Sequence, residues 1–179
     1  VTDVEAICKE YHITKQRWLC TGGATFQEST MNGILNLKNK ITEDDIVVIS
    51  FGVAPMTPQE DINDSIRVCK EHGNAIASAD IDLCTCIKDD EFSTTQNIIR
   101  ETMKGFANPW TFKFGELCDV YEEAVRKDIL KDLEPHLALG KRLWFSQCTS
   151  PQCKITHKTD LDIFEGSLLL KEKREKEKK

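Results

Sequence analysis

Two kinds of hydrophobic pattern alternate along the first half of the chain. The run IVVISF at residues 46–51 is continuous and β-branched, as is typical of a strand buried on both faces, and a second strand is predicted over residues 75–79. Between them, apolar residues recur at helical spacing over residues 57–72, with Pro58 in the first turn. This alternation predicts an α/β fold around a mostly parallel sheet.

The same patterns predict the remaining elements. Further helices are expected over residues 2–11, 28–39 and 115–129 and from residue 158 onward. Short strands are expected over residues 18–20, 84–88, 97–99 and 143–145, and a strand or turn over 111–114. We expect one domain over residues 1–170, in which residues 80–109 interrupt the alternation and form a protruding β-arm.

A strand–turn–helix unit near the N-terminus carries the strongest local signal. The apolar run that ends at Cys20 is followed by Gly22 and Gly23, and then by a helical pattern with Glu28 or Ser29 as its cap. Paired glycines permit positive φ and a close approach of a ligand to the main chain, and a helix N-terminus offers N–H groups to an anion or a polar ring. A plain strand-to-helix turn is the alternative interpretation.

The sequence GGATFQESTMNGIL at residues 22–35 resembles the signature of the sugar- and polyol-phosphate cytidylyltransferases, which include the methylerythritol-phosphate and ribitol-phosphate enzymes. In that family the segment holds the cytosine ring. The resemblance therefore implies that Gly22, Gly23, Ala24 and Ser29 bind the nucleotide. One position departs from the family pattern, because Phe26 stands in the place of an arginine.

A second matching segment has lost its charged residues. Residues 46–58 correspond to a strand and loop that in the family read His-Asp-(Ala/Ser)-x-Arg-Pro-Phe. Ser50 takes the place of the histidine, Phe51 that of the aspartate that binds metal, and Ala54 that of the arginine, whereas Pro55 is retained. The resemblance implies Mg²⁺ as cofactor, but with Phe51 in the ligand position we assign no metal ligand in this chain.

The second half of the chain supplies the candidate catalytic residues. Two family motifs are matched here. One contains Arg100, followed after eight residues by Asn108, and the other is the stretch QCKITHKTDL at residues 152–161, which contains Lys154 and Thr156. Nucleotidyl transfer needs cations that neutralise phosphate charge in the transition state. By resemblance, Lys154 and Arg100 are catalytic, whereas Asn108 and Thr156 bind the acceptor; a surface lysine without function is the alternative for Lys154.

The resemblance extends from about residue 4 to 166 and implies a Rossmann-like nucleotidyltransferase fold with helices on both faces of the sheet. The implied reaction transfers CMP from CTP to 2-C-methyl-D-erythritol 4-phosphate, ribitol 5-phosphate or a similar acceptor and releases pyrophosphate. The resemblance also implies that the protein is cytoplasmic and forms a homodimer, and that isoprenoid biosynthesis is one pathway in which it could act. Family members open with a glycine-rich triphosphate loop; this sequence starts after it, so we expect an N-terminally truncated domain.

Two other functions remain open from the sequence. One is a catalytically degenerate member that serves as a nucleotide-binding or dimerisation module, because the substitutions fall on charged catalytic positions while the apolar pattern is intact. The other is an unrelated α/β binding module. Tight, metal-dependent binding of CTP would exclude the degenerate module.

Charge and composition narrow the range of possible binding partners. The net charge of the 179 residues is −6, and residues 171–179 contribute +3, so the rest carries −9. An acidic body argues against nucleic acid as a partner, and the charged tail is expected to be disordered or a frayed helix end. No apolar run is long enough to cross a bilayer. The pairs Cys84/Cys86 and Cys148/Cys153 lack the usual zinc spacing, and we expect neither zinc nor disulfides.

Overall fold

The computed structural model describes residues 2–130, 134–149 and 154–177. The chain divides into two compact units. The first comprises Val1–Asp45 and Lys113–Leu143, and the second comprises Ile46–Phe112 and Trp144–Lys179. Cys153 and Gln152, which belong to two of the motifs named above, lie outside the described residues.

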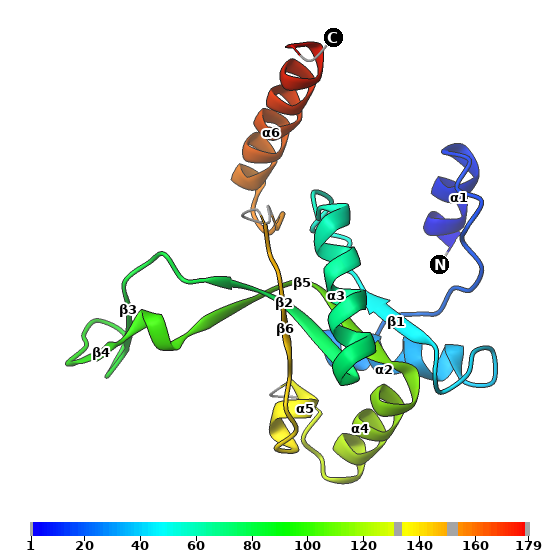
Figure 1. Ribbon diagram of the computed structural model, residues 1–179, viewed down its shortest axis with the longest axis horizontal. Helices are drawn as coiled ribbons and strands as arrows, with labels where there is room; N and C mark the ends of the chain where they lie inside the picture. Colours follow the sequence, from blue (N-terminus) through cyan, green and yellow to red (C-terminus); the bar gives the residue numbers. More distant parts are fainter. Residues whose placement is uncertain (1, 131–133, 150–153, 178–179) are drawn as a thin grey trace. The chain divides into compact units, whose positions relative to one another are not determined.

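The described elements follow the predicted order closely (Figure 1). The helices are α1 Thr2–Glu10, α2 Phe26–Leu37, α3 Gln59–His72, α4 Phe114–Arg126, α5 Pro135–Ala138 and α6 Lys158–Glu177. The strands are β1 Ile46–Ile49, β2 Asn74–Asp80, β3 Thr85–Ile87, β4 Gln96–Ile98, β5 Lys104–Lys113 and β6 Phe145–Ser146, and Arg100–Thr102 forms a 3₁₀ turn.

The second unit is built on a four-stranded sheet in the order β1-β5-β2-β6. β2 pairs with β6 in parallel, but with β5 in antiparallel fashion, with Asn74 opposite Phe112 and an irregularity between Ile76 and Ser78. The α/β fold is as predicted, but the sheet is mixed where a mostly parallel one was expected. The physical reason is the arm: the chain leaves the sheet after β2 and returns beside it, which reverses the direction of β5.

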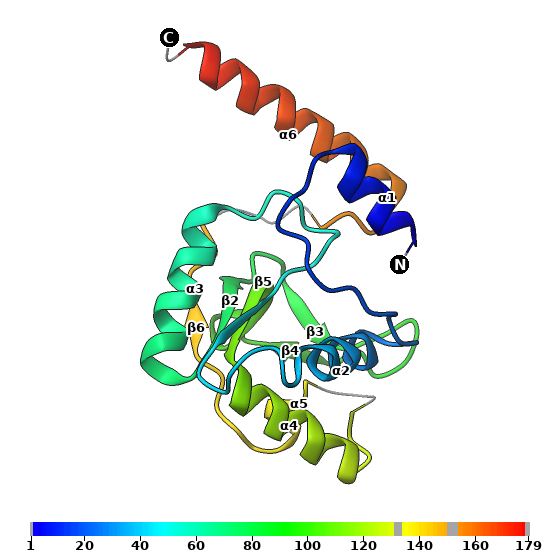
Figure 2. The ribbon, with the colours of Figure 1, turned by 90° about the vertical axis from the view of Figure 1, so that its right-hand side faces the viewer.

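Helix α3 covers one face of this sheet, as Figure 2 shows for β2 and β6. Val68 and Cys69 on α3 pack with Ala75 on β2, and Ile46 and Trp144 border this cluster. Burial of such apolar side chains is the main force that holds a helix on a sheet. At the end of α3, the ring of His72 stacks on Trp144 with centroids 3.8 Å apart. Helix α3 and strand β2 thus form the core of this unit, whereas β1, which was predicted to be buried on both faces, is only half-buried along its length.

The arm consists of β3 and β4, which pair antiparallel in a sheet of their own (Figure 1). Its turn is closed by carboxylates. Asp89 accepts hydrogen bonds from the hydroxyl and the backbone N–H of Thr95, and these, with Gln96, hold the pKa of Asp89 below its usual value. The two short strands were predicted to within about two residues. Homodimerisation through residues 80–109 stays a prediction.

The first unit consists of helices. The buried face of α4 carries Leu117, Val120, Tyr121 and Ala124, and α2 buries Ile34. Burial also raises the pKa of the Tyr121 phenol well above its usual range. The strand predicted over residues 18–20 is not formed, because this extended segment has no ladder partner among the described residues. An apolar run alone does not make a strand without a neighbouring strand to pair with.

Helix α6 continues through Glu177 and so includes most of the charged segment 171–179. None of its described residues is buried, and Leu169 and Leu170 on it are exposed. Among the described helices, none combines the length and the apolar character that a membrane span needs.

Candidate functional site

The glycine turn of the first unit is tied to the start of α2 by side chains. Ser29 Oγ accepts from Gly23 N at 2.9 Å, and a Glu28 carboxylate oxygen accepts from Ala24 N at 2.7 Å. Two of the main-chain donors that the sequence assigned to a nucleotide are thus engaged within the protein. Ser29 in this structure holds the turn, and its predicted contact with a nucleotide stays a prediction.

The cap of α2 is Thr25, not Glu28 or Ser29. Thr25 Oγ1 accepts from Glu28 N at 3.1 Å, and the backbone of Thr25 has extended dihedral angles. The sequence held this signal, since Thr25 followed three residues later by Glu28 is the pattern of a capping box.

The paired glycines are required for space rather than for a left-handed backbone. Positive φ occurs at Gly73 and Gly140 among the described glycines, and neither Gly22 nor Gly23 has it. A Cβ added at Gly23 would lie 2.3 Å from Glu28 Cβ, and one at Gly22 would lie 3.2 Å from Ser29 Oγ. The turn thus packs directly against α2, and this close approach excludes a side chain.

The second unit holds a hollow of about 210 Å³ that contains two of the predicted site residues, Lys154 and Asn108. The other lining residues are apolar or small: Phe51, Ala54, Ala79, Gly105, Phe106, Ala107 and Cys148. Among the described residues that line it, Lys154 is the sole charged one. Lys154 itself is exposed, so it can attract an anion, but solvent and salt screen this attraction.

Asn108 is a structural centre of this hollow. Its side chain is almost completely buried, at 1% exposure, and its Oδ1 accepts from Phe51 N at 2.8 Å. Its Nδ2 donates to Ser50 Oγ at 3.1 Å and to Thr57 Oγ1 at 2.6 Å. The amide thereby fixes the loop after β1 to β5. Its predicted contact with an acceptor phosphate stays a prediction.

Phe51, at one of the substituted positions, is part of an aromatic wall. Phe51 meets Trp110 edge to face with ring centroids 5.6 Å apart, and Phe106 meets the same ring at 6.0 Å. Trp110 is held by its Nε1, which donates to Ala107 O at 2.8 Å. Edge-to-face aromatic pairs of this kind stabilise a fixed ring arrangement. The side chain of Phe51, which stands where the resemblance predicts a charged residue, is therefore accommodated by packing.

This wall does not fit the expected Mg²⁺. Magnesium binds through oxygen ligands, and no lining residue of the hollow carries a carboxylate. Across the residues that the structure describes, there is also no group of three or more His, Cys, Asp or Glu side chains placed to hold a metal ion.

Arg100 and Thr156 lie outside the lining of this hollow. Arg100 stands in the 3₁₀ turn before β5, where its guanidinium donates to Asp82 O at 3.0 Å and to Glu101 at 3.2 Å. Thr156 donates its backbone N–H to Asp160 at the start of α6. Their assigned roles stay predictions.

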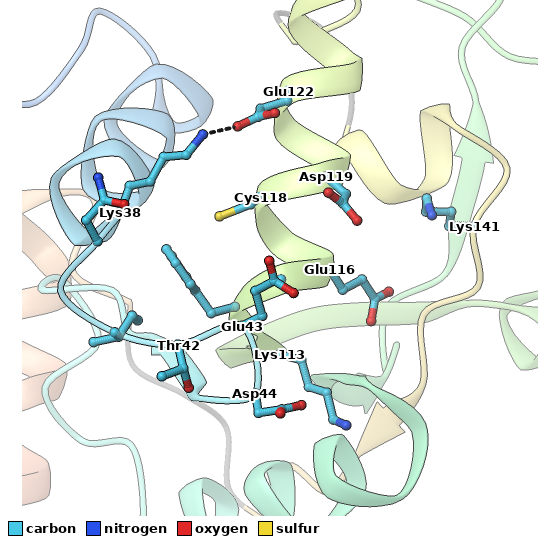
Figure 3. Close-up of a pocket in the computed structure, with 14 residues that line it drawn as sticks. Lys38, Thr42, Glu43, Asp44, Lys113, Glu116, Cys118, Asp119, Glu122 and Lys141 are labelled. Atoms are coloured by element: carbon cyan, nitrogen blue, oxygen red, sulfur yellow. Dashed lines mark hydrogen bonds and ion pairs between the residues drawn. The ribbon is translucent and has the colours of Figure 1, made fainter.

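The first unit contains a larger cavity of about 710 Å³, between the loop after α2 and the start of α4 (Figure 3). Five carboxylates and three lysines line it, and one lysine, Lys38, pairs with Glu122 at 2.7 Å. This hydrogen bond lowers the pKa of Glu122. Because carboxylates outnumber ammonium groups, the cavity is unsuited to a phosphate, and the smaller hollow at Lys154 is the better candidate for one.

The fold and its sequence relatives define an α/β protein of the nucleotidyltransferase class. The sequence profile of 2-C-methyl-D-erythritol 4-phosphate cytidylyltransferase matches residues 3–169. The ribitol-5-phosphate cytidylyltransferase of Lacticaseibacillus paracasei is 32% identical over 169 residues, which cover 92% of this chain and 72% of that protein. The chain therefore belongs to the 2-C-methyl-D-erythritol 4-phosphate cytidylyltransferase family, as the resemblance predicted.

Other relatives agree with this placement. The 2-C-methyl-D-erythritol 4-phosphate cytidylyltransferase of Clostridium novyi is 27% identical over 168 residues, covering 92% of this chain and 71% of that protein. The crystal structure of 4-diphosphocytidyl-2C-methyl-D-erythritol synthase from Anaerococcus prevotii superimposes with a TM-score of 0.77 at 19% identity, covering 94% of this chain and 78% of that one. The likeness between the structures shows a shared fold.

Proposed function

We propose that the protein transfers CMP from CTP to a polyol or sugar phosphate of the ribitol 5-phosphate or 2-C-methyl-D-erythritol 4-phosphate type and releases pyrophosphate. The observation that carries the proposal is the match to the family over residues 3–169, with Lys154 at the edge of an otherwise uncharged hollow. Relatives named for either acceptor match the chain, so both acceptors are candidates.

In this proposal Lys154 is the cation that contacts phosphate. Lys154 is an exposed residue on the lining of the hollow, and Asn108 fixes the walls beside it. A phosphate nucleophile is already ionised at neutral pH, so the protein has no proton to remove and contributes positioning and charge stabilisation. Gly22, Gly23, Ala24 and Ser29 are assigned to the cytidine nucleotide and Arg100 to catalysis, each by the family pattern.

The test measures pyrophosphate release from CTP with each acceptor in turn. Replacing Lys154 by Ala should lower turnover by about 10²–10³-fold, the usual effect of removing one group that stabilises transition-state charge. Lys70→Ala, a surface lysine on α3 of the same unit, is the matched control and should leave turnover unchanged. Equal turnover by the Lys154→Ala variant and the native protein would remove the assigned role of Lys154.

A second candidate is a nucleotide-binding module without catalysis. The observation that favours it is the aromatic wall, because Phe51 and Ala54 stand where the family pattern has the metal-binding aspartate and an arginine. Calorimetric titration with CTP, together with the assay of pyrophosphate release, separates the two candidates. Turnover on either acceptor contradicts the module, whereas CTP binding without turnover on either acceptor contradicts the enzyme.

A further inference from the structure

Two cysteines of the arm lie outside the lining of the hollow at Lys154. Cys84 directly precedes β3 and Cys86 lies within it, and both are free thiols on exposed residues. Thr85, between them, is half-buried. Side chains two residues apart on a strand point to the same face, and the one between them points to the opposite face. The burial pattern therefore indicates that the two thiols share the exposed face of the arm.

The two thiols also line one hollow of about 420 Å³, which lies on the arm and is open to solvent. Asn97 is the residue opposite Cys86 in the ladder, so its amide lies on the thiol face and can donate to a sulfur. Among the described residues that line this hollow, none carries a carboxylate or an ammonium group. The thiols are therefore its most strongly ligating groups. The other lining residues carry hydroxyl or amide groups: Thr85, Thr94, Thr95 and Gln96.

The turn of the arm holds the two strands in this register. Thr94 Oγ1 donates to Ile87 O at 2.6 Å, and Asp89 N donates to Ser93 O at 3.0 Å. Ser93 Oγ in turn donates to Asp90 at 2.7 Å. The hairpin is thus formed before any ligand arrives. A site on a preformed hairpin loses little conformational entropy on binding, so even two ligands can hold an ion.

The spacing of the two thiols favours a bridging metal ion over a disulfide. Cα atoms two residues apart on a strand are separated by about 6.6 Å. A disulfide needs Cβ atoms about 3.8 Å apart, which parallel side chains at this spacing do not reach. Two sulfurs bound in line to one metal ion, each at about the 2.3 Å of a zinc–sulfur bond, are about 4.6 Å apart. Rotation about the two Cα–Cβ bonds is enough to bring the sulfurs to that separation.

The number and type of ligands select the metal. Zinc requires three or four protein ligands, and the described part of the chain holds no group of three or more His, Cys, Asp or Glu side chains placed to bind a metal ion. Magnesium and calcium ions require oxygen ligands. Thiolates are soft ligands that select Cu(I), and this ion accepts two ligands in a line.

We propose that Cys84 and Cys86 bind one Cu(I) ion as a pair of thiolates on the exposed face of the arm. Binding forms two copper–sulfur bonds and releases the two thiol protons to the solvent, with no change in the oxidation state of copper or sulfur. The site is separate from the hollow at Lys154, so this inference and the proposed transfer of CMP stand or fall independently.

The test is a competition for Cu(I) between the reduced protein, kept free of oxygen, and the coloured complex of Cu(I) with bicinchoninate. The native protein should withdraw one Cu(I) per chain, and X-ray absorption of the product should show two sulfur neighbours. Cys84→Ser and Cys86→Ser should each lower the affinity for Cu(I) by at least about 10²-fold, more than the usual loss when only a group that supports a ligand is removed. Native affinity in either variant would overturn the proposal.

Two controls separate the paired thiols from thiols in general. Cys20→Ser removes another exposed thiol, which belongs to the first unit, and should leave the affinity for Cu(I) unchanged. Cys84→Ser combined with Thr85→Cys keeps the number of thiols but places them on opposite faces of the strand, so it should bind as weakly as Cys86→Ser. Native affinity in this double variant would contradict a site built on a shared face. The two single variants replace exposed side chains, so the result does not depend on whether the double variant folds.

Discussion

The close packing of Gly23 against Glu28 leads to a prediction for a single substitution. A methyl group at Gly23 would lie 2.3 Å from Glu28 Cβ and 2.9 Å from its backbone carbon, so the turn or the start of α2 must move. We expect Gly23→Ala to lower the free energy of unfolding by about 1–3 kcal/mol, the usual cost of overpacking. Urea denaturation followed by circular dichroism measures this change.

Gly33 is the matched control for this substitution. It lies inside α2, and a Cβ there would meet no atom within 4 Å. Gly33→Ala should raise the free energy of unfolding by about 0.5–1 kcal/mol, since alanine is the better helix former. If both variants change stability by the same amount in the same direction, the close approach at Gly23 is not what the glycine provides.

Two residues that line the candidate site, Lys154 and Asn108, were predicted from the sequence, but their partners in the fold were not. Gly22, Gly23 and Lys154 stand in a recognisable local pattern, and the Thr25–Glu28 cap has a pattern of its own. Asp61, a buried acid of α3, has no such pattern, because Thr149, which donates its backbone N–H to this carboxylate, is 88 residues away. A buried acid and a surface acid look alike in a sequence, and only the fold separates them.

At the level of one element, the start of α6 depends on a single carboxylate. Asp160 accepts from the backbone N–H groups of His157 and Thr156, both at 2.7 Å, and these bonds lower its pKa. Because the pKa is lowered in the folded chain, the stabilisation is complete above the unfolded value of about 4 and is lost as the pH falls through the lowered value. Asp160→Ala should therefore reduce helicity at pH 7.

The pH dependence provides the check on this prediction. The difference in far-ultraviolet circular dichroism between native protein and Asp160→Ala should shrink as the pH falls below the unfolded value of about 4 and vanish once the pH is below the lowered pKa of Asp160. Asp162→Ala, two residues further along, removes an acid that accepts no backbone hydrogen bond among those the structure describes. A difference that persists unchanged at low pH would contradict the capping role of Asp160.

The elements themselves were predictable wherever their burial follows from local pattern. The β-branched run at 46–51 and the periodic segment at 57–72 became β1 and α3 with small shifts at their ends. The direction of β5 was not predictable, because it depends on how the arm returns to the sheet. The ten residues of β5 were expected only as a strand or turn over 111–114, since Gly105 and Pro109 interrupt the pattern.

At the level of the whole molecule, fold and chemistry have diverged to different extents. The family profile spans residues 3–169, and the described sheet and helices follow the family fold at a TM-score of 0.77. By the resemblance of the sequence, Phe26, Phe51 and Ala54 stand at positions where the family pattern has charged residues, and this correspondence stays a prediction. Apolar packing tolerates such replacements, whereas catalysis is sensitive to each one, so the fold is a poor guide to the rate.

The lack of charged residues at the wall of the hollow leads to a prediction about how nucleotide binding depends on Mg²⁺. The protein has a net charge of −6, and of the lining residues that the structure describes, only Lys154 is charged. CMP that binds there should have the same dissociation constant in Mg²⁺ and in a chelator, because no lining carboxylate can share the metal with the phosphate. Phe51→Asp introduces a carboxylate at the same wall. It should weaken CMP binding in chelator by pairing with Lys154, and Mg²⁺ should restore the affinity.

Phe51→Asn separates charge from shape in this experiment. It removes the same ring from Trp110 but adds no charge, so its affinity for CMP should not respond to Mg²⁺. A native protein whose CMP affinity rises steeply with Mg²⁺ would place the phosphate site elsewhere, with ligands outside this hollow. If the metal response appears in Phe51→Asp and in neither the native protein nor Phe51→Asn, one lost carboxylate accounts for the lost metal site.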